Sequence, residues 1–282
     1  MSGFSCLPFF LQSLRGPLFA VYHRPTDPQS VRGNVLCVPP FNEEVNRCRS
    51  MITLQAEAFA AMGWGTLLVD LHGTGDSAGN YVDARWTTWQ QDLATAAAWL
   101  DGQRGGLRAV WGIRLGAILA CQLHAARADP SVAVLLWQPV ADGKTHLTQF
   151  MRVRIAAQME RADLPKESTA AMRAQLAAGQ PVEIAGYELH PELTAAIDSA
   201  RLADHALPAG ARLLWLENAS PDNPQLSPAT QTLLSRWPGP EVQGQGQVFA
   251  GPAFWQVHER VVTPAVIEHG TAWLDGDAGR VR

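Results

Sequence analysis

The stretch Trp111-Gly112-Ile113-Arg114-Leu115-Gly116-Ala117 decides how the rest of this sequence is interpreted. Its two glycines have the spacing of a nucleophile elbow, G-x-S-x-G, a sharp turn that carries a serine between a strand and a helix. Arg114 stands at the position of that serine. A guanidinium stays protonated at neutral pH and has no lone pair for attack, so Arg114 cannot be the nucleophile, although it can bind anions. In the elbow geometry Arg114 would also have a positive φ, and strain of that kind tends to persist where a site needs it.

Predicted strands and helices alternate on both sides of this turn. A hairpin is predicted over residues 9–14 and 18–22, further strands over residues 35–38, 64–70, 107–111, 132–137, 212–216 and 242–249, and helices over residues 49–62, 87–100, 115–127, 228–237 and 264–274. Such alternation predicts an α/β fold with a mostly parallel sheet and helices on both faces.

The alternation stops between residues 142 and 207. This segment shows helical stretches near residues 147–162 and 166–178 but no convincing strand, and we interpret it as an inserted helical cap. The predicted organisation is a core of residues 1–141 and 208–275, a cap of residues 142–207 and a flexible tail of residues 276–282.

Composition excludes several classes of function. With 282 residues and 47% apolar content, the chain can bury the core of a large α/β domain. A net charge of -4 without a run of basic residues argues against a nucleic-acid partner. The apolar residues 4–11 are too few to span a bilayer, so we expect neither a signal peptide nor a membrane span. The four cysteines form no C-x-x-C pair and the eight histidines show no metal-ligand spacing, which predicts a cytoplasmic protein without a metal or cofactor.

A second glycine-rich turn, Asp70-Leu71-His72-Gly73-Thr74-Gly75-Asp76-Ser77, follows the predicted strand of residues 64–70. It is similar to the D-x-x-G-x-G-x-S turn that precedes the elbow in many α/β-hydrolases, and one predicted helix separates the two turns. Together the turns predict the α/β-hydrolase fold. No G-x-G-x-x-G opens a helix in an early βαβ unit, so nucleotide binding is not expected.

Four segments carry a resemblance to a known family: Pro39-Pro40-Phe41-Asn42-Glu43-Glu44-Val45-Asn46, Ala84-Arg85-Trp86, Trp111-Gly112-Ile113-Arg114-Leu115-Gly116 and Phe254-Trp255. They resemble the exosortase A system-associated hydrolase 2 family, within the α/β-hydrolase superfamily, over nearly the whole chain. The resemblance implies a setting of exopolysaccharide production and of sorting of proteins with a PEP-type C-terminal signal. It also implies that arginine is usual at the elbow and that proteins of the same gene cluster are candidate partners. The resemblance does not imply the biochemical substrate, but similar gene clusters often include an acyl ligase and a carrier protein, which makes an acyl ester or thioester a reasonable substrate.

The sequence offers only weak candidates for the acid and the histidine of a Ser-His-Asp triad. The acid would follow the predicted strand of residues 212–216, where Asp222 is the best candidate. The histidine would follow the last strand, but Ala253 stands at the matching position and His258 lies a few residues further on. A Ser-His-Asp mechanism is therefore not expected.

The position of residues 39–46, in the loop after the first predicted parallel strand, indicates that they form part of an oxyanion hole. In this fold one N–H group comes from that loop and the other from the residue after the nucleophile. These positions correspond to Phe41 or Asn42 and to Leu115, which we expect to contact a ligand.

Acidic, aromatic and amide side chains complete the predicted site. Glu43 and Glu44 are predicted to lie in the loop, within reach of Arg114. In one interpretation a glutamate only neutralises the buried guanidinium of Arg114. In the other, the glutamate lies at the mouth of a ligand site in which Arg114 binds a carboxylate, phosphate or carbonyl oxygen of the ligand. Trp255 follows the last strand and either packs the core or walls the ligand, and Gln138 would add a polar contact.

Three functions remain open from the sequence. The first is a protein that binds an acyl or anionic small molecule in a pocket centred on Arg114, with serine-type hydrolysis lost. The second is an active esterase, thioesterase or acyltransferase in which Glu44 or Asp222 activates water while Arg114 stabilises the oxyanion. The third is a non-catalytic scaffold whose cap binds another protein of the export machinery.

Overall fold

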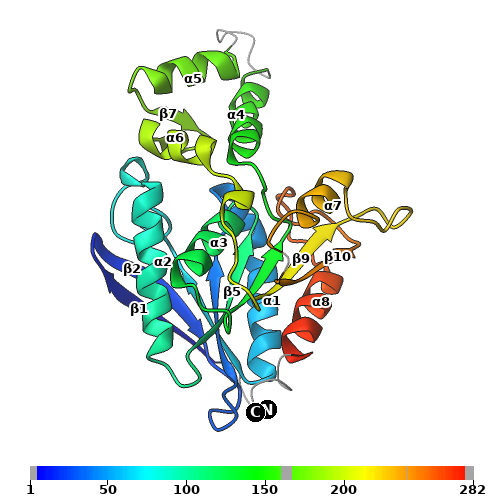
Figure 1. Cartoon of the computed structure of the whole chain (residues 1–282). Coiled ribbons are helices and arrows are strands. Elements are labelled where there is room, and N and C mark those ends of the chain that lie inside the picture. The colour runs from blue at the N-terminus through cyan, green and yellow to red at the C-terminus, as the bar shows by residue number, and fades with distance from the viewer. Residues whose placement is uncertain (1–4, 160–166, 240, 277–282) are drawn as a thin grey trace.

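A computed structural model describes residues 5–159, 167–239 and 241–276. Its centre is an eight-stranded sheet with the order β1-β2-β4-β3-β5-β6-β9-β10 (Figure 1). The strands are β1 (Cys6–Ser13), β2 (Gly16–His23), β3 (Gly33–Val38), β4 (Trp64–Val69), β5 (Leu107–Ile113), β6 (Ala133–Trp137), β9 (Arg212–Asn218) and β10 (Gln243–Phe249). β2 pairs antiparallel with β1 and β4, whereas all pairs from β4 to β10 are parallel. The predicted N-terminal hairpin and mostly parallel sheet are confirmed.

Helices cover both faces of the sheet. α1 (Glu43–Ala61) packs against α8 (Pro264–Asp275), and α2 (Trp86–Asp101) packs against α3 (Gly116–Arg127); short helices η1 (Tyr81–Asp83) and α7 (Pro228–Leu234) lie in connections. Successive side chains of a strand point to opposite faces, and β3 shows the result. Its Leu36 and Val38 belong to the cluster packed against α2 and α3, whereas Val35 and Cys37 belong to the cluster packed against α1 and α8.

The chain leaves the sheet between β6 and β9. There it forms α4 (Gly143–Met159), α5 (Thr169–Ala177), β7 (Val182–Ile184), β8 (Tyr187–Leu189), α6 (Pro191–Ser199) and η2 (Leu202–Asp204). In Figure 1 the elements α4, α5, β7 and α6 stand together over the edge at which β5 and β9 end. We refer to residues 142–207 as the cap.

The expectation of no strand in the cap is wrong. β7 and β8 form a hairpin around Ala185 and Gly186, both of which have a positive φ. Strands of three residues are too short to show a period-2 pattern, so the sequence gave no signal for them. Residues 160–166, which include the end of the first predicted cap helix and the start of the second, and the predicted tail beyond Gly276 lie outside the described residues.

α1 begins at Glu43, six residues before the predicted start at Arg49. Asn42 is its N-cap with a φ of 52°, and Glu43 and Glu44 form its first turn. Carboxylates at this end of a helix are favoured by the helix dipole. The sequence predicted a loop for the two glutamates, and this prediction is wrong because both lie on α1. Among the described residues, no helix is both long enough and apolar enough to cross a membrane.

Gly116 sets how closely α3 approaches the end of β3. A Cβ at this position would lie 2.3 Å from the Pro39 carbonyl oxygen and 2.6 Å from that of Val38. We predict that Gly116→Ala lowers the free energy of unfolding by about 1–3 kcal/mol, because the backbone must move to relieve the overlap.

Denaturant unfolding measures this effect, with Gly102→Ala as the control. The nearest atom to a Cβ at Gly102 is 3.4 Å away, an ordinary contact. Equal stability of the two variants would contradict the close approach of α3 to β3.

Candidate functional site

Arg114 occupies the turn between β5 and α3 with a φ of 52°. Its backbone N–H donates to the carbonyl of Trp137 at 3.0 Å, and its carbonyl accepts from the Val140 N–H at 3.1 Å. Both bonds tie the turn to the chain that leaves β6. The elbow geometry expected from the glycine spacing is therefore present, with an arginine at its centre.

The Arg114 guanidinium is held by three groups. Its Nε donates to Glu44 Oε1 at 3.1 Å, and its Nη1 donates to the Gln138 carbonyl at 3.0 Å. The ring of Trp255 has its centroid 5.4 Å from the guanidinium carbon, within the range of a cation–π contact. The Arg114 and Glu44 side chains are only 12% and 15% exposed. Glu44, Gln138 and Trp255 therefore all contact Arg114. Of these three contacts, the sequence suggested only the one with Glu44.

Burial raises the pKa of the Glu44 carboxyl, and the Arg114 guanidinium opposes that rise. Removing a charge from water is costly, and a nearby opposite charge compensates part of the cost. Glu44 Oε2 is buried without a hydrogen-bond partner among the described residues. The carboxylate is thus held in place by Arg114 through one oxygen only.

The cap contributes a neutral histidine to this region. His146, on the first turn of α4, is 7% exposed, and its ring centroid lies 5.9 Å from that of Phe41. Burial lowers the pKa of His146 to about 3, and Arg114 adds to the effect. His146 is therefore uncharged at neutral pH and packs the cap against the loop before α1.

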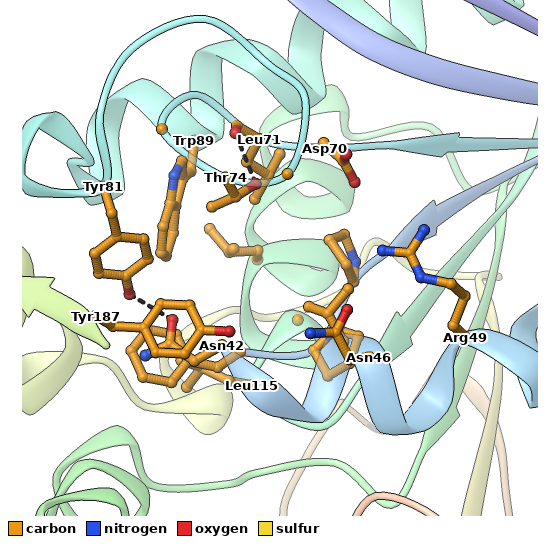
Figure 2. A pocket seen from close by; sticks show the side chains of 18 of the residues that line it. Asn42, Asn46, Arg49, Asp70, Leu71, Thr74, Tyr81, Trp89, Leu115 and Tyr187 are labelled. Atoms are coloured by element: carbon orange, nitrogen blue, oxygen red, sulfur yellow. Dashed lines mark hydrogen bonds between the residues drawn. The ribbon is translucent and has the colours of Figure 1, made fainter. Parts of the chain in front are cut away.

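A cavity of about 360 Å³ lies beside the elbow (Figure 2). It is bounded by one face of α1, by the turn after β4, by the start of α3 and by the cap hairpin; its lining includes Phe41, Asn42, Val45, Asn46, Arg49, Asp70, Leu71, Thr74, Tyr81, Trp89, Leu115, Leu119 and Tyr187. The volume is within the range of small-molecule sites. Phe41, Asn42 and Leu115, for which the sequence predicted ligand contacts, line this cavity, whereas Arg114, Glu44 and Trp255 are not among its lining residues.

Asn42 presents a fixed amide beside this cavity. Its Oδ1 accepts a hydrogen bond from the Tyr81 hydroxyl at 2.5 Å, which Figure 2 shows as a dashed line. Burial raises the pKa of Tyr81, so the phenol keeps its proton and acts as the donor. Asn42 is 7% exposed, and its Nδ2 has no partner among the described residues. An acceptor oxygen from a ligand would satisfy this donor.

The remaining acidic and basic candidates lie elsewhere. Glu43 is half-buried, and burial raises its pKa while Arg47 and His258 oppose the rise. His258 is exposed, with its Nε2 3.3 Å from Arg47 Nη2. Asp222 is exposed in the loop after β9, where its N–H donates to Ser220 Oγ. In the described part of the chain, neither His258 nor Asp222 forms a hydrogen bond or ion pair with Arg114, so these residues do not assemble a triad around the elbow.

Gln138 joins the elbow to the end of β9. Its Oε1 accepts from the Asn218 N–H at 2.6 Å, in addition to the bond from its carbonyl to Arg114. It lines a second, more open cavity of about 900 Å³ together with Glu217. Glu217 is the buried carboxylate of this region, but its oxygens accept from the Ser227 N–H and from the hydroxyl of Thr230, at the start of α7.

Sequence reasoning missed four side chains of this region: Arg49, Tyr81, His146 and Tyr187. An earlier helix start would have placed Arg49 two turns after Asn42 and on the same face of α1. Nothing local to the other three positions distinguishes them from packing residues. Within residues 5–159, 167–239 and 241–276 no group of three or more His, Cys, Asp or Glu side chains could hold a metal ion.

Comparison with protein families gives a match over most of the chain. The model of the family described as X-Pro dipeptidyl-peptidase (S15 family) matches residues 18–232. The chain belongs to the S15 family. No curated protein matched the sequence of this S15-family chain significantly.

Solved structures confirm the α/β-hydrolase fold for this S15-family chain. Est1E from Butyrivibrio proteoclasticus with bound ferulic acid has a TM-score of 0.64 and 12% identity, with 96% of this chain and 98% of that chain covered. A highly thermostable carboxyl esterase from Bacillus coagulans in complex with glycerol has a TM-score of 0.62 and 15% identity, with 98% and 100% covered. XC6422 from Xanthomonas campestris, described as a serine hydrolase without lid, has a TM-score of 0.51 and 13% identity, with 98% and 93% covered.

We predict that Glu44→Gln lowers the free energy of unfolding by about 2 kcal/mol, because it removes the countercharge of a largely buried guanidinium. Asp101→Asn is the control, since Asp101 pairs with Arg127 at a site where the two side chains are 42% and 26% exposed. The control should cost less than about 1 kcal/mol. Denaturant unfolding measures the free energy of unfolding of both variants. A Glu44→Gln variant as stable as the control would contradict a structural ion pair at the elbow.

Proposed function

We propose that this S15-family protein binds a small acyl or aryl molecule and has lost serine-type hydrolysis. The observation that carries the proposal is the Arg114–Glu44 ion pair at the point where a serine nucleophile would stand. Arg114 has no nucleophilic atom. Ala253 is at the expected histidine position, and His258 pairs with Arg47 instead. The family name describes a dipeptidyl-peptidase, but the chain lacks the groups for that chemistry at its elbow.

The ligand site in this proposal is the cavity beside the elbow. It contains both predicted oxyanion-hole positions, Leu115 and Phe41 or Asn42, and is closed on one side by Tyr187 of the cap. Arg114 is not among the residues that line this cavity. We therefore place the ligand next to Arg114 and not on it, which refines the anion site expected from the sequence.

We further propose the exosortase-associated setting that the sequence resemblance implies. Three of the four segments that carry the resemblance, residues 39–46, 111–116 and 254–255, meet around Arg114 in the structure, because they contain Glu44, the elbow and Trp255. A cytoplasmic location fits the four cysteines, all of which are unpaired. Proteins of the same gene cluster are then candidate partners, and the gene neighbourhood of this chain tests the setting.

An enzyme that uses Glu44 is the second candidate. Its raised pKa and the buried, unpartnered Oε2 are features of a general acid or base. In that case Glu44 would activate water for an ester or thioester while Arg114 stabilises the oxyanion. A purely structural scaffold gains no support from the 360 Å³ cavity, which a vestigial site would be expected to fill with side chains.

We predict that a fluorophosphonate probe leaves the protein unlabelled and that p-nitrophenyl esters are not turned over, because no activated serine lies at the elbow. An active serine esterase serves as the positive control for both assays. Covalent labelling would overturn the loss of serine chemistry. Turnover that disappears in Glu44→Gln, in a variant shown to be folded, would favour the second candidate.

We predict that the protein binds members of a panel of acyl and aryl compounds and that Thr74→Trp weakens this binding by at least about tenfold. The Thr74 side chain lies in the cavity (Figure 2), so an indole there would occupy ligand volume. Thr87→Trp on the exposed start of α2 is the control. Titration calorimetry measures both, and a panel without any binder, or equal binding by the two variants, would contradict the proposed site.

A further inference from the structure

The cavity beside the elbow runs along one face of α1. Its lining includes the N-cap residue Asn42 and, on α1, Val45, Asn46 and Arg49, of which Val45 and Asn46 lie four and three residues before Arg49 and so share its helix face. Seven residues of α-helix correspond to about 10 Å along the axis. Figure 2 shows Asn42 with Tyr81 and Tyr187 at one side of the cavity, and Arg49 with Asp70 and Asn46 at the other. The cavity therefore has two polar ends, separated by two helical turns.

The inner end of the cavity contains the Asn42 amide. Tyr81 donates to Asn42 Oδ1 and so fixes which end of the amide remains available. Asn42 Nδ2 is then a donor, more than nine-tenths buried, without a partner in the described part of the chain. A buried donor left unpaired costs free energy, so a ligand oxygen that reached Asn42 Nδ2 and accepted a hydrogen bond would recover that cost.

The outer end offers a cation. Arg49 is exposed, and its guanidinium forms no hydrogen bond or ion pair with any residue that the structure describes. Asp70 is the acidic neighbour: its pKa is raised by burial and lowered by Arg49, and its Oδ2 accepts from the Asp76 N–H at 3.2 Å. Arg49 contrasts with Arg114, whose Nε and Nη1 donate to Glu44 and to the Gln138 carbonyl. Of these two arginines, only Arg49 lines the cavity.

Aromatic rings line the space between the two ends. Phe41 and Trp89 meet edge to face with centroids 6.3 Å apart, and Tyr81 and Tyr187 do so at 5.0 Å. All four residues line the cavity. Rings arranged in this way offer faces and edges to a further aromatic ring, which favours an aryl group over a flexible acyl chain.

We propose that the ligand is a small aromatic carboxylate whose carboxylate binds Arg49 and whose oxygen substituent at the far side of the ring accepts from Asn42 Nδ2. The inference rests on the proposed binding function and names the ligand class for the same cavity. Arg49 binds the carboxylate of the ligand, and Asn42, held by its hydrogen bond from Tyr81, donates to the oxygen at the other end of the ligand. The Arg114–Glu44 pair supports the elbow and does not contact the ligand.

The test compares two probes, 3-(4-hydroxyphenyl)propanoate and its primary amide, which differ in charge at one end only. We expect Arg49→Gln to weaken binding of the carboxylate by about tenfold and to leave binding of the amide unchanged, because one charge-assisted hydrogen bond is lost. Arg15→Gln, at the exposed turn of the β1–β2 hairpin, is the control and should change neither. Asp70→Asn should tighten binding of the carboxylate several-fold, because a like charge is removed. Titration calorimetry measures each affinity.

The outcomes separate this inference from the proposed function. Equal weakening of both probes by Arg49→Gln, or no weakening of either, would overturn the anion anchor. If other members of the acyl and aryl panel bind in a manner sensitive to Thr74→Trp while neither probe binds, the ligand class is wrong and the proposed function stands. If no compound binds at all, the proposed function fails and the inference fails with it.

Discussion

The ion pair between Arg114 and Glu44 is the constraint on which the site depends. A cation at the tip of the elbow must be neutralised in a region where its side chain is 12% exposed, and the first turn of α1 supplies the carboxylate. Arg114 thus links the end of β5 to α1 through Glu44 and to the chain after β6 through the Gln138 carbonyl. The ring of Trp255, in the connection between β10 and α8, makes a cation–π contact with the same guanidinium. Elements that in an active hydrolase would bring a nucleophile and a base together are here joined by a salt bridge and a cation–π contact.

The side chains that hold the elbow in place differ from those that line the cavity beside it. The Arg114 guanidinium donates to Glu44, and Arg114 is not among the lining residues of the cavity, which include Asn42, Leu115 and Arg49. The chain thus combines a cavity beside its elbow with an arginine at the serine position that is engaged in an ion pair. The two features do not exclude one another, because different side chains form them.

Much of the fold, and part of the site, could be predicted from the sequence. The spacing of Gly112 and Gly116 predicted the positive φ of Arg114, because strand and helix can approach so closely only at glycine. The pairing of Glu44 with Arg114 was foreseen as one of two alternatives. Arg49 was not, because charged residues at the start of α1 hide its apolar period, and with it the true start of the helix. Tyr187 and His146 reach the site through the tertiary placement of the cap, which no local pattern encodes.

The coupling energy between Arg114 and Glu44 tests the central claim most directly. A double-mutant cycle of Arg114→Met, Glu44→Leu and the double variant isolates it from the separate effects of the two substitutions. The account predicts a coupling of about 1–3 kcal/mol in the free energy of unfolding, with the double variant more stable than the sum of the single losses implies. A coupling near zero would show that the two side chains do not depend on one another and would contradict the account.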